Sequence, residues 1–203
     1  MKYQTEKGVL IEEYDEAAEN PRTFSEHHTT FYTFSNRHNS PDEHSYKDFV
    51  SWLFDTLPVG AAKALDAEAK ENHGMNMSHL ISEYYKRGVV LLPVYKYEHS
   101  GIVYKAAESN PFSCPFDSGI IGVIYARKQD IHKEYGKRLC KSILETVHNL
   151  MIAEVDEYSA WADGNVYCYC LEGEEEWIGG FYGDISENGA KEHFGVSEAT
   201  PIY

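Results

Sequence analysis

Two polar segments near the middle of the chain carry side chains suited to proton transfer. The first is Glu98-His99-Ser100-Gly101, in which an imidazole stands between an acid and a hydroxyl. Histidine titrates closest to neutral pH, so His99 is a candidate general base or acid. The same four residues also suit a solvated turn in which glycine supplies a positive φ angle.

The second segment is the loop 110–119, Asn-Pro-Phe-Ser-Cys-Pro-Phe-Asp-Ser-Gly, which its two prolines make rigid. In a hydrolase or phosphodiesterase, Asp117 would orient His99, and Ser118 would donate to a developing oxyanion. Cys114 would pair with His99 as a nucleophile if the loop folded over the turn. Asp117 and Ser118 are equally suited to bonding backbone amides, and a cysteine between prolines and aromatics is more often packed than reactive.

We take His99, Asp117 and Ser118 as the candidate catalytic residues. Ser100 and Cys114 are candidate ligand-binding residues beside them. Asp184 is a further candidate for ligand binding, because it follows a glycine at the end of an expected strand. Turns use acids in that position as well.

Residues 38–44 hold another group of polar side chains, with His38, Asp42, Glu43 and His44 inside seven positions. Imidazole and carboxylate together suit a hard or borderline metal ion. A helix that begins at Asp42 would explain the two acids by the helix dipole, and the histidines would then not need to converge. We predict neither a metal nor another cofactor.

The elements that position these residues follow from hydrophobic periodicity and turn signals. Residues 89–126 are expected to form a strand, a turn, a strand, a loop and a strand, which would hold both polar segments at one rim. Other strands are expected at 8–11, 29–34, 166–171 and 177–182, and helices at about 40–54, 60–70, 77–87, 129–135 and 137–158.

Strands that cluster instead of alternating with helices favour an α+β fold over a doubly wound one. We expect a mainly antiparallel sheet of five to six strands with inserted and packed helices. The 203 residues suit a single domain, with a helical insertion at about 42–87 and an acidic C-terminal quarter at 151–203.

The formal net charge of −15 is unevenly distributed along the chain. Residues 151–203 hold twelve Asp and Glu against one Lys, whereas residues 101–150 hold five acids against seven bases. Such a field repels nucleic acid and attracts basic protein surfaces, although acidic faces also serve solubility. We expect no direct nucleic-acid binding, since the one basic stretch is typical of helix-surface charge: Arg127, Lys128, Lys133, Lys137, Arg138 and Lys141.

Several classes of protein are disfavoured by missing patterns. There is no Gly-x-Gly-x-x-Gly, Walker or Gly-x-Ser-x-Gly motif, which argues against dinucleotide-binding, P-loop and α/β-hydrolase proteins. The four cysteines contain no Cys-x-x-Cys pair, and neither a signal peptide nor a membrane-length apolar run is evident. We therefore expect a cytoplasmic protein that has free thiols and does not associate with membranes.

Three stretches together resemble a known family. They are His38-Asn39 with Asp42-Glu43-His44, the segment from Leu92 through His99-Ser100-Gly101 and 111–119 to Tyr125, and Gly164–Tyr167 with Gly180–Asp184. The set resembles uncharacterised small acidic proteins encoded by phages and conjugative elements, chiefly of Firmicutes. That family usually has Trp-Asp-Ser-Gly-Gln where this chain has Phe-Asp-Ser-Gly-Ile at 116–120. The resemblance implies genomic context, since such accessory proteins often act on host machinery or host defence.

The leading hypothesis is an accessory protein of a phage or mobile element that binds a host protein with a basic surface, or a small ligand. Its role would include counter-defence of an anti-restriction or anti-CRISPR-like kind. The first alternative is a small hydrolase or phosphodiesterase that uses His99, Asp117 and Ser118. The second is an acidic DNA mimic, which needs carboxylates spaced like phosphates.

Overall fold

A computed structural model describes residues 1–24, 27–35, 37, 39–136 and 140–202. Within them, seven helices and nine strands form two antiparallel sheets, which confirms the predicted α+β class. The chain divides into two compact units: the terminal unit, Met1–Ser25 with Glu157–Tyr203, and the central unit, Glu26–Asp156. The single domain expected from the sequence stays a prediction.

The terminal unit is a five-stranded sheet with a short helix. Its strand order is β8-β7-β2-β1-β9, and every neighbouring pair is antiparallel. The elements are β1 (Lys2–Thr5), β2 (Gly8–Tyr14), α1 (Pro21–Phe24), β7 (Val166–Leu171), β8 (Ile178–Tyr182), α7 (Ala190–Phe194) and β9 (Thr200–Ile202). Alternation along the strands places Tyr3, Leu10 and Tyr169 in a small core with Phe181.

A buried carboxylate lies in that core. Glu12 is only 8% exposed, and its Oε2 accepts hydrogen bonds from the hydroxyls of Tyr3 at 3.1 Å and Tyr169 at 2.7 Å. Asn188 Nδ2 donates to the Tyr169 hydroxyl at 3.1 Å. Burial raises the pKa of both tyrosines, and the nearby Glu12 carboxylate raises it further. Both phenols therefore stay protonated and remain donors.

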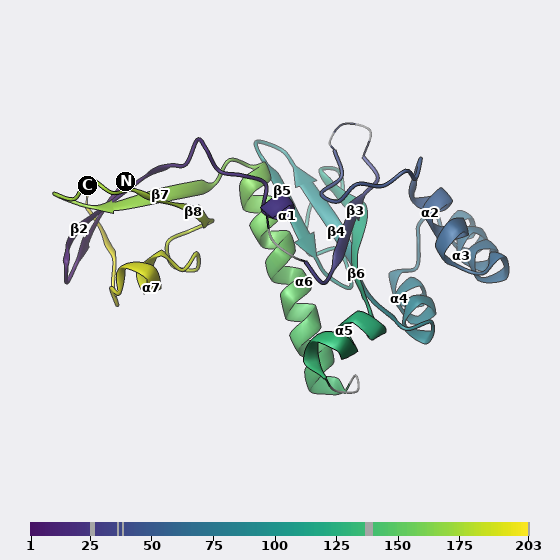
Figure 1. Cartoon of the computed structure of the whole chain (residues 1–203). Coiled ribbons are helices and arrows are strands. Elements are labelled where there is room, and N and C mark those ends of the chain that lie inside the picture. The colour runs from purple at the N-terminus through teal and green to yellow at the C-terminus, as the bar shows by residue number, and fades with distance from the viewer. Residues whose placement is uncertain (25–26, 36, 38, 137–139, 203) are drawn as a thin grey trace. The chain divides into compact units, whose positions relative to one another are not determined.

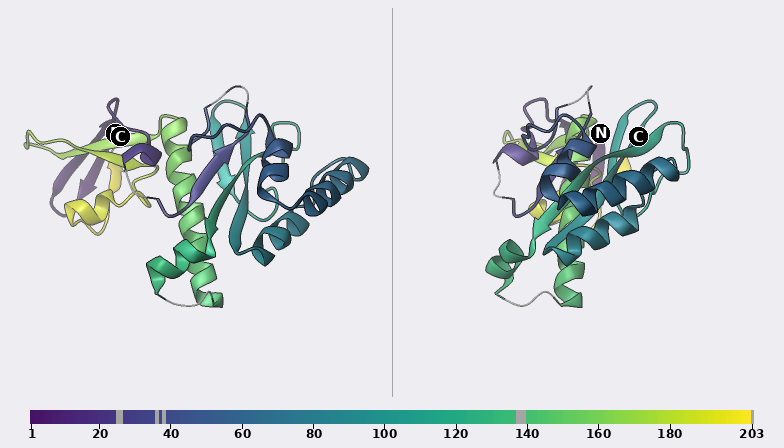
Figure 2. Two further views of the ribbon diagram at one scale, coloured as in Figure 1. Left: turned by 45° about the vertical axis from the view of Figure 1, so that its right-hand side comes forward. Right: turned by 90° about the vertical axis from the view of Figure 1, so that its right-hand side faces the viewer.

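The central unit is a four-stranded sheet between helices. Its strand order is β3-β6-β4-β5. Figures 1 and 2 show α6 along one face of this sheet and α2, α3 and α4 on the other. The elements are β3 (Thr30–Thr33), α2 (Phe49–Thr56), α3 (Val59–Glu71), α4 (Met77–Lys86), β4 (Val89–Glu98), β5 (Ile102–Ala106), β6 (Ser118–Arg127), α5 (Lys128–Tyr135) and α6 (Lys141–Ala162), whose last residues belong to the terminal unit.

Alternate residues of β4 face the two helical layers. Leu91 packs with Trp52, Leu53 and Tyr84 of α2 and α4 in one core cluster. Leu92, the next residue, lies on the side of α6 and lines a groove with Ile152. A continuous apolar run in β4 is thus explained by burial on both faces.

The predicted sequence of strand, turn, strand, loop and strand over 89–126 is confirmed by β4, β5 and β6. The start of α2 was predicted wrongly, at about residue 40. Asp42 instead accepts a hydrogen bond from the Phe31 amide at 2.7 Å, which ties it to β3. Asp48 and Ser51 form a reciprocal capping box, and α2 begins at Phe49.

Gly122 marks an irregularity where β6 pairs with two neighbours. The register of β6 against β4 shifts between Val94 and Tyr95. A Cβ atom at position 122 would lie 2.0 Å from the Tyr32 carbonyl oxygen, so only glycine fits this approach of β3. Within the described residues, no helix is long and apolar enough to cross a membrane.

Candidate functional site

The two polar loops of the central unit meet at one end of the sheet. The Glu98 amide donates to the Asp117 carbonyl at 3.0 Å, and the rings of Tyr97 and Phe112 stack with centroids 5.5 Å apart. His99 Nδ1 lies 3.6 Å from Asp117 Oδ2. The structure therefore brings together the imidazole and the carboxylate that the sequence proposed as a pair.

The hydroxyl and thiol of the same loop have other partners. Ser118 Oγ donates to the Cys114 carbonyl at 2.5 Å and accepts from Asn110 Nδ2 at 3.0 Å. Cys114 Sγ donates to Asp117 Oδ2 at 3.2 Å. These bonds close the loop on itself. Their partners are a carbonyl, a side-chain amide and a thiol, whereas the alternative interpretation of Asp117 and Ser118 expected bonds to backbone amides.

The His99–Asp117 pair is open to solvent. The side chain of His99 is 68% exposed and that of Asp117 is 37% exposed, and Ser100 is exposed at the tip of the turn. Water around such an exposed pair weakens the electrostatic stabilisation that a reacting group would need.

Asp184 belongs to the terminal unit, where it organises the turn after β8. Its carboxylate accepts from the Ser186 amide at 2.8 Å, and its carbonyl accepts from the amides of Glu187 and Asn188. The bonds from Ser186 lower the pKa of Asp184. The side chain is exposed and remains able to contact a partner.

Of the residues at 38–44 that were considered as metal ligands, Asp42 and His44 bond to the backbone of β3. His38 lies outside the described residues. His44 Nε2 is 2.8 Å from the Thr33 carbonyl, and Glu43 is exposed. Within the described residues, no group of three or more His, Cys, Asp and Glu side chains is arranged to hold a metal ion. The expected absence of a metal stays a prediction.

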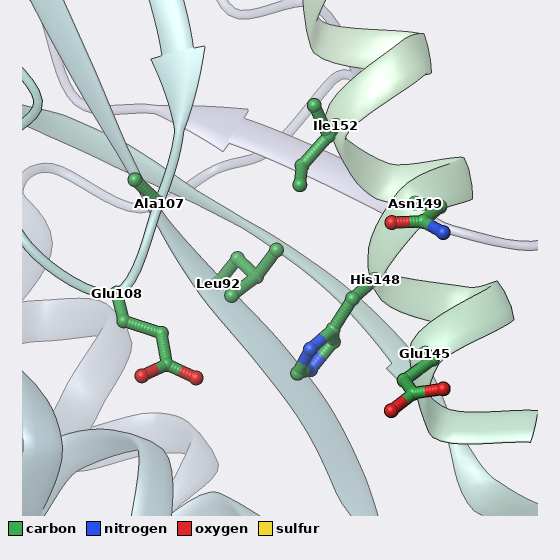
Figure 3. Close-up of a pocket in the computed structure, with 7 residues that line it drawn as sticks. All are labelled: Leu92, Ala107, Glu108, Glu145, His148, Asn149 and Ile152. Carbon is green, nitrogen blue, oxygen red and sulfur yellow. The ribbon is translucent and has the colours of Figure 1, made fainter. Parts of the chain in front are cut away.

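A groove on the α6 side of the central sheet was not anticipated from the sequence. It has a volume of about 490 Å³, and Figure 3 shows the Glu108 carboxylate and the His148 ring facing each other across it. Burial lowers the pKa of His148, and the charge of Glu108 opposes this shift. Positions 145, 148, 149 and 152 of α6 line one wall, a helical spacing that was visible in the sequence.

A second cavity, on the opposite face of the sheet, is lined by aromatic rings and two arginines. It has a volume of about 360 Å³. Its residues come from α2 and the loop before it, from the C-terminal end of α4 with the residue that follows, and from the adjacent ends of β4 and β6. Because these elements are far apart in the sequence, the cavity was not predicted.

The terminal unit carries most of the charge. It holds sixteen Asp and Glu against four Lys and Arg, and thirteen of those acids are exposed. The densest part is the acidic hairpin loop, residues 172–177, which joins β7 to β8 and reads Glu-Gly-Glu-Glu-Glu-Trp. Lys2 pairs with Glu172 at 2.8 Å, and the Trp177 side chain is 41% exposed.

Comparisons of the chain with protein-family models, with curated proteins and with solved structures each found no match. The interpretation of the site therefore depends on the residues and geometry described above.

Proposed function

We propose that this protein is an accessory protein of a phage or other mobile element that binds a basic surface of a host protein. Its terminal unit makes the contact, and a counter-defence role is the most direct use of such binding. The observation that carries the proposal is the acidic hairpin loop, where an exposed Trp177 adjoins three consecutive glutamates.

The glutamates of the acidic hairpin loop and the Trp177 ring have complementary roles in such a contact. Exposed carboxylates attract a basic partner over about 8–10 Å at physiological salt and accelerate the encounter. A tryptophan beside them supplies the apolar area that a salt-screened charge contact lacks, and tryptophan is among the residues that dominate interface energies. The mobile-element context comes from the resemblance found in the sequence.

The proposal is tested by capture from host lysate followed by reconstitution. The immobilised full chain is exposed to lysate, retained proteins are eluted with rising NaCl, and each is identified, purified and re-measured alone by interferometry. We expect a basic partner whose affinity falls with salt. Replacing Glu174, Glu175 and Glu176 together by Gln weakens it by about tenfold or more.

The matched control neutralises three exposed acids of the central unit, Glu43, Glu71 and Glu134. This variant removes the same charge from the chain and is expected to bind within twofold of the wild type. Equal losses in the two triple variants, or a purified partner indifferent to both, would refute the proposal. Competition by duplex DNA for the partner would assign the contact to the DNA-mimic form of the hypothesis.

A hydrolase or phosphodiesterase centred on His99 and Asp117 is the second candidate, favoured by their 3.6 Å separation. Turnover of p-nitrophenyl acetate and of bis-p-nitrophenyl phosphate by the full chain is the test. His99→Ala is expected to abolish any true turnover, because the imidazole would be the proton acceptor. A rate that His99→Ala leaves unchanged removes this candidate.

A further inference from the structure

The cavity of about 360 Å³ in the central unit has the composition of a small-ligand site. Its volume lies in the lower part of the range that ligand pockets occupy. Apolar rings form its walls, and charged groups stand at its rim. The lining residues are Tyr46, Trp52, Asp55, Thr56, Tyr84, Arg87, Val89, Tyr125 and Arg127.

Aromatic rings make the cavity complementary to a flat group. Trp52 and Tyr84 stack with centroids 4.9 Å apart and planes 11° from parallel. Tyr125 lies 6.3 Å from Trp52, measured between ring centroids. Thr56 Oγ1 is 2.5 Å from the Tyr84 hydroxyl, which fixes that ring. Because Trp52 and Tyr84 cover each other and are only 1% and 3% exposed, the partly exposed rings of Tyr46 and Tyr125 are the aromatic surfaces that a ligand can contact. Rings held in place by such packing bind a flat group with little loss of conformational entropy.

Two arginines give the rim its affinity for an anion. Val89 and Arg127 are register partners in the sheet, and Arg87 lies two residues before Val89. Arg87 Nη1 donates to Glu83 Oε2 at 2.7 Å, whereas the exposed Arg127 guanidinium has no hydrogen bond or ion pair within the described part of the chain. An arginine fork matches the oxygens of a phosphate better than any other side chain.

A carboxylate at the cavity can accept from a ligand. Asp55 is exposed and accepts from the Tyr46 hydroxyl at 3.2 Å, and a carboxylate can accept further hydrogen bonds. The cavity thus offers an acceptor to a ring that bears an amino group. The indole Nε1 of Trp52 makes no hydrogen bond in the described part of the chain, but it is buried away from the cavity and takes no part in this contact.

We propose that this cavity binds a nucleoside monophosphate, with the phosphate on Arg127 and Arg87 and the base against the rings of Tyr46 and Tyr125. The base would present a donor, such as an amino group, to Asp55. The site is independent of the partner contact proposed above, since every lining residue belongs to the central unit.

The test is calorimetric titration of the full chain with AMP, GMP, CMP and UMP. We expect at least one to bind, with its nucleoside and inorganic phosphate each at least about tenfold weaker. No heat of binding from any of the four at about 1 mM would overturn the proposal. Equal affinity for the nucleoside would overturn the phosphate contact and with it the proposal.

Variants separate the cavity from general charge attraction. Arg127→Gln, an exposed substitution that should fold, is expected to weaken binding by about tenfold or more. Arg37→Gln removes the same charge from an exposed position that does not line the cavity, and should bind within twofold of the wild type. Equal losses in both variants, or no loss in Arg127→Gln, would show that the cavity is not the site.

Discussion

The terminal and central units differ in what each offers to another molecule. The terminal unit has a formal charge of −12 in 72 residues, and the central unit has −3 in 131. The groove, the aromatic cavity and both polar loops all lie in the central unit. The two proposed modes of recognition, by surface charge and by a recess, thus lie in different parts of one chain, and separate substitutions can address each.

The strongest test of this division is a pair of cavity-forming substitutions. Leu10→Ala in β2 and Leu53→Ala in α2 each truncate a side chain with 0% exposure. Each is expected to lower the free energy of unfolding by about 2–5 kcal/mol. Hydrogen exchange should show lost protection in β2 and β7 for the first variant, and in β4 and β6 for the second. Loss throughout both sheets in either variant would show that the two units unfold as one.

A smaller effect is expected from the buried carboxylate of the terminal unit. Glu12→Ala leaves the hydroxyls of Tyr3 and Tyr169 without their acceptor, and should lower the unfolding free energy by about 2–3 kcal/mol in urea titrations. Glu12→Gln keeps an acceptor oxygen and should cost less. The adjacent exposed acid, Glu13, provides the control. Glu13→Ala should change the unfolding free energy by less than about 0.5 kcal/mol.

Alkaline pH should weaken the same network. The pKa of Tyr169 is raised in the folded protein, mainly by burial, whereas the pKa of a tyrosine in the unfolded chain is about 10. The folded state therefore retains a proton that the unfolded state releases, and the unfolding free energy falls above about pH 10. Tyr169→Phe should remove up to about 1.4 kcal/mol per pH unit from that slope, measured by urea titrations at several pH values.

The smallest expected effect concerns the groove of the central unit. Burial lowers the pKa of His148, so its stabilisation is complete above the unfolded value of about 6.5 and is lost as pH falls through the folded value. His148→Gln should flatten the stability profile below about pH 6.5 by a few tenths of a kcal/mol, because the ring is partly solvated. A profile that matches the wild type would show that the ring is not held neutral.

Local patterns predicted those parts of the fold that neighbouring residues determine. Continuous apolar runs identified β4 and β6, and period-2 alternation identified β7. Helical spacing identified α4, and glycine stops marked the ends of α4 and α5. The start of α2 was predicted near Pro41, and the capping box of Asp48 and Ser51 that begins the helix was not recognised in the sequence. The strand β9 was missed because its three residues become a strand only by pairing with β1.

Of the candidate sites, only the one formed by neighbouring segments of the chain was predicted from the sequence. His99 and Asp117 were found because a hairpin tip and a loop between consecutive strands must lie close together. The aromatic cavity was not, since Trp52, Tyr84 and Arg127 meet only after α2 and α4 pack on the sheet. The hydrogen bond between Glu12 and Tyr169 joins opposite ends of the chain, and no local sequence pattern predicts such a contact.

The close approach at Gly122 has an evolutionary consequence. A side chain at that position would occupy the space of the Tyr32 carbonyl, so descendants of this fold cannot vary there while β3 stays paired with β6. Most surface positions, in contrast, tolerate substitution with little effect on stability. We expect an aligned set of diverged relatives to retain glycine at 122 after most other identities have been lost.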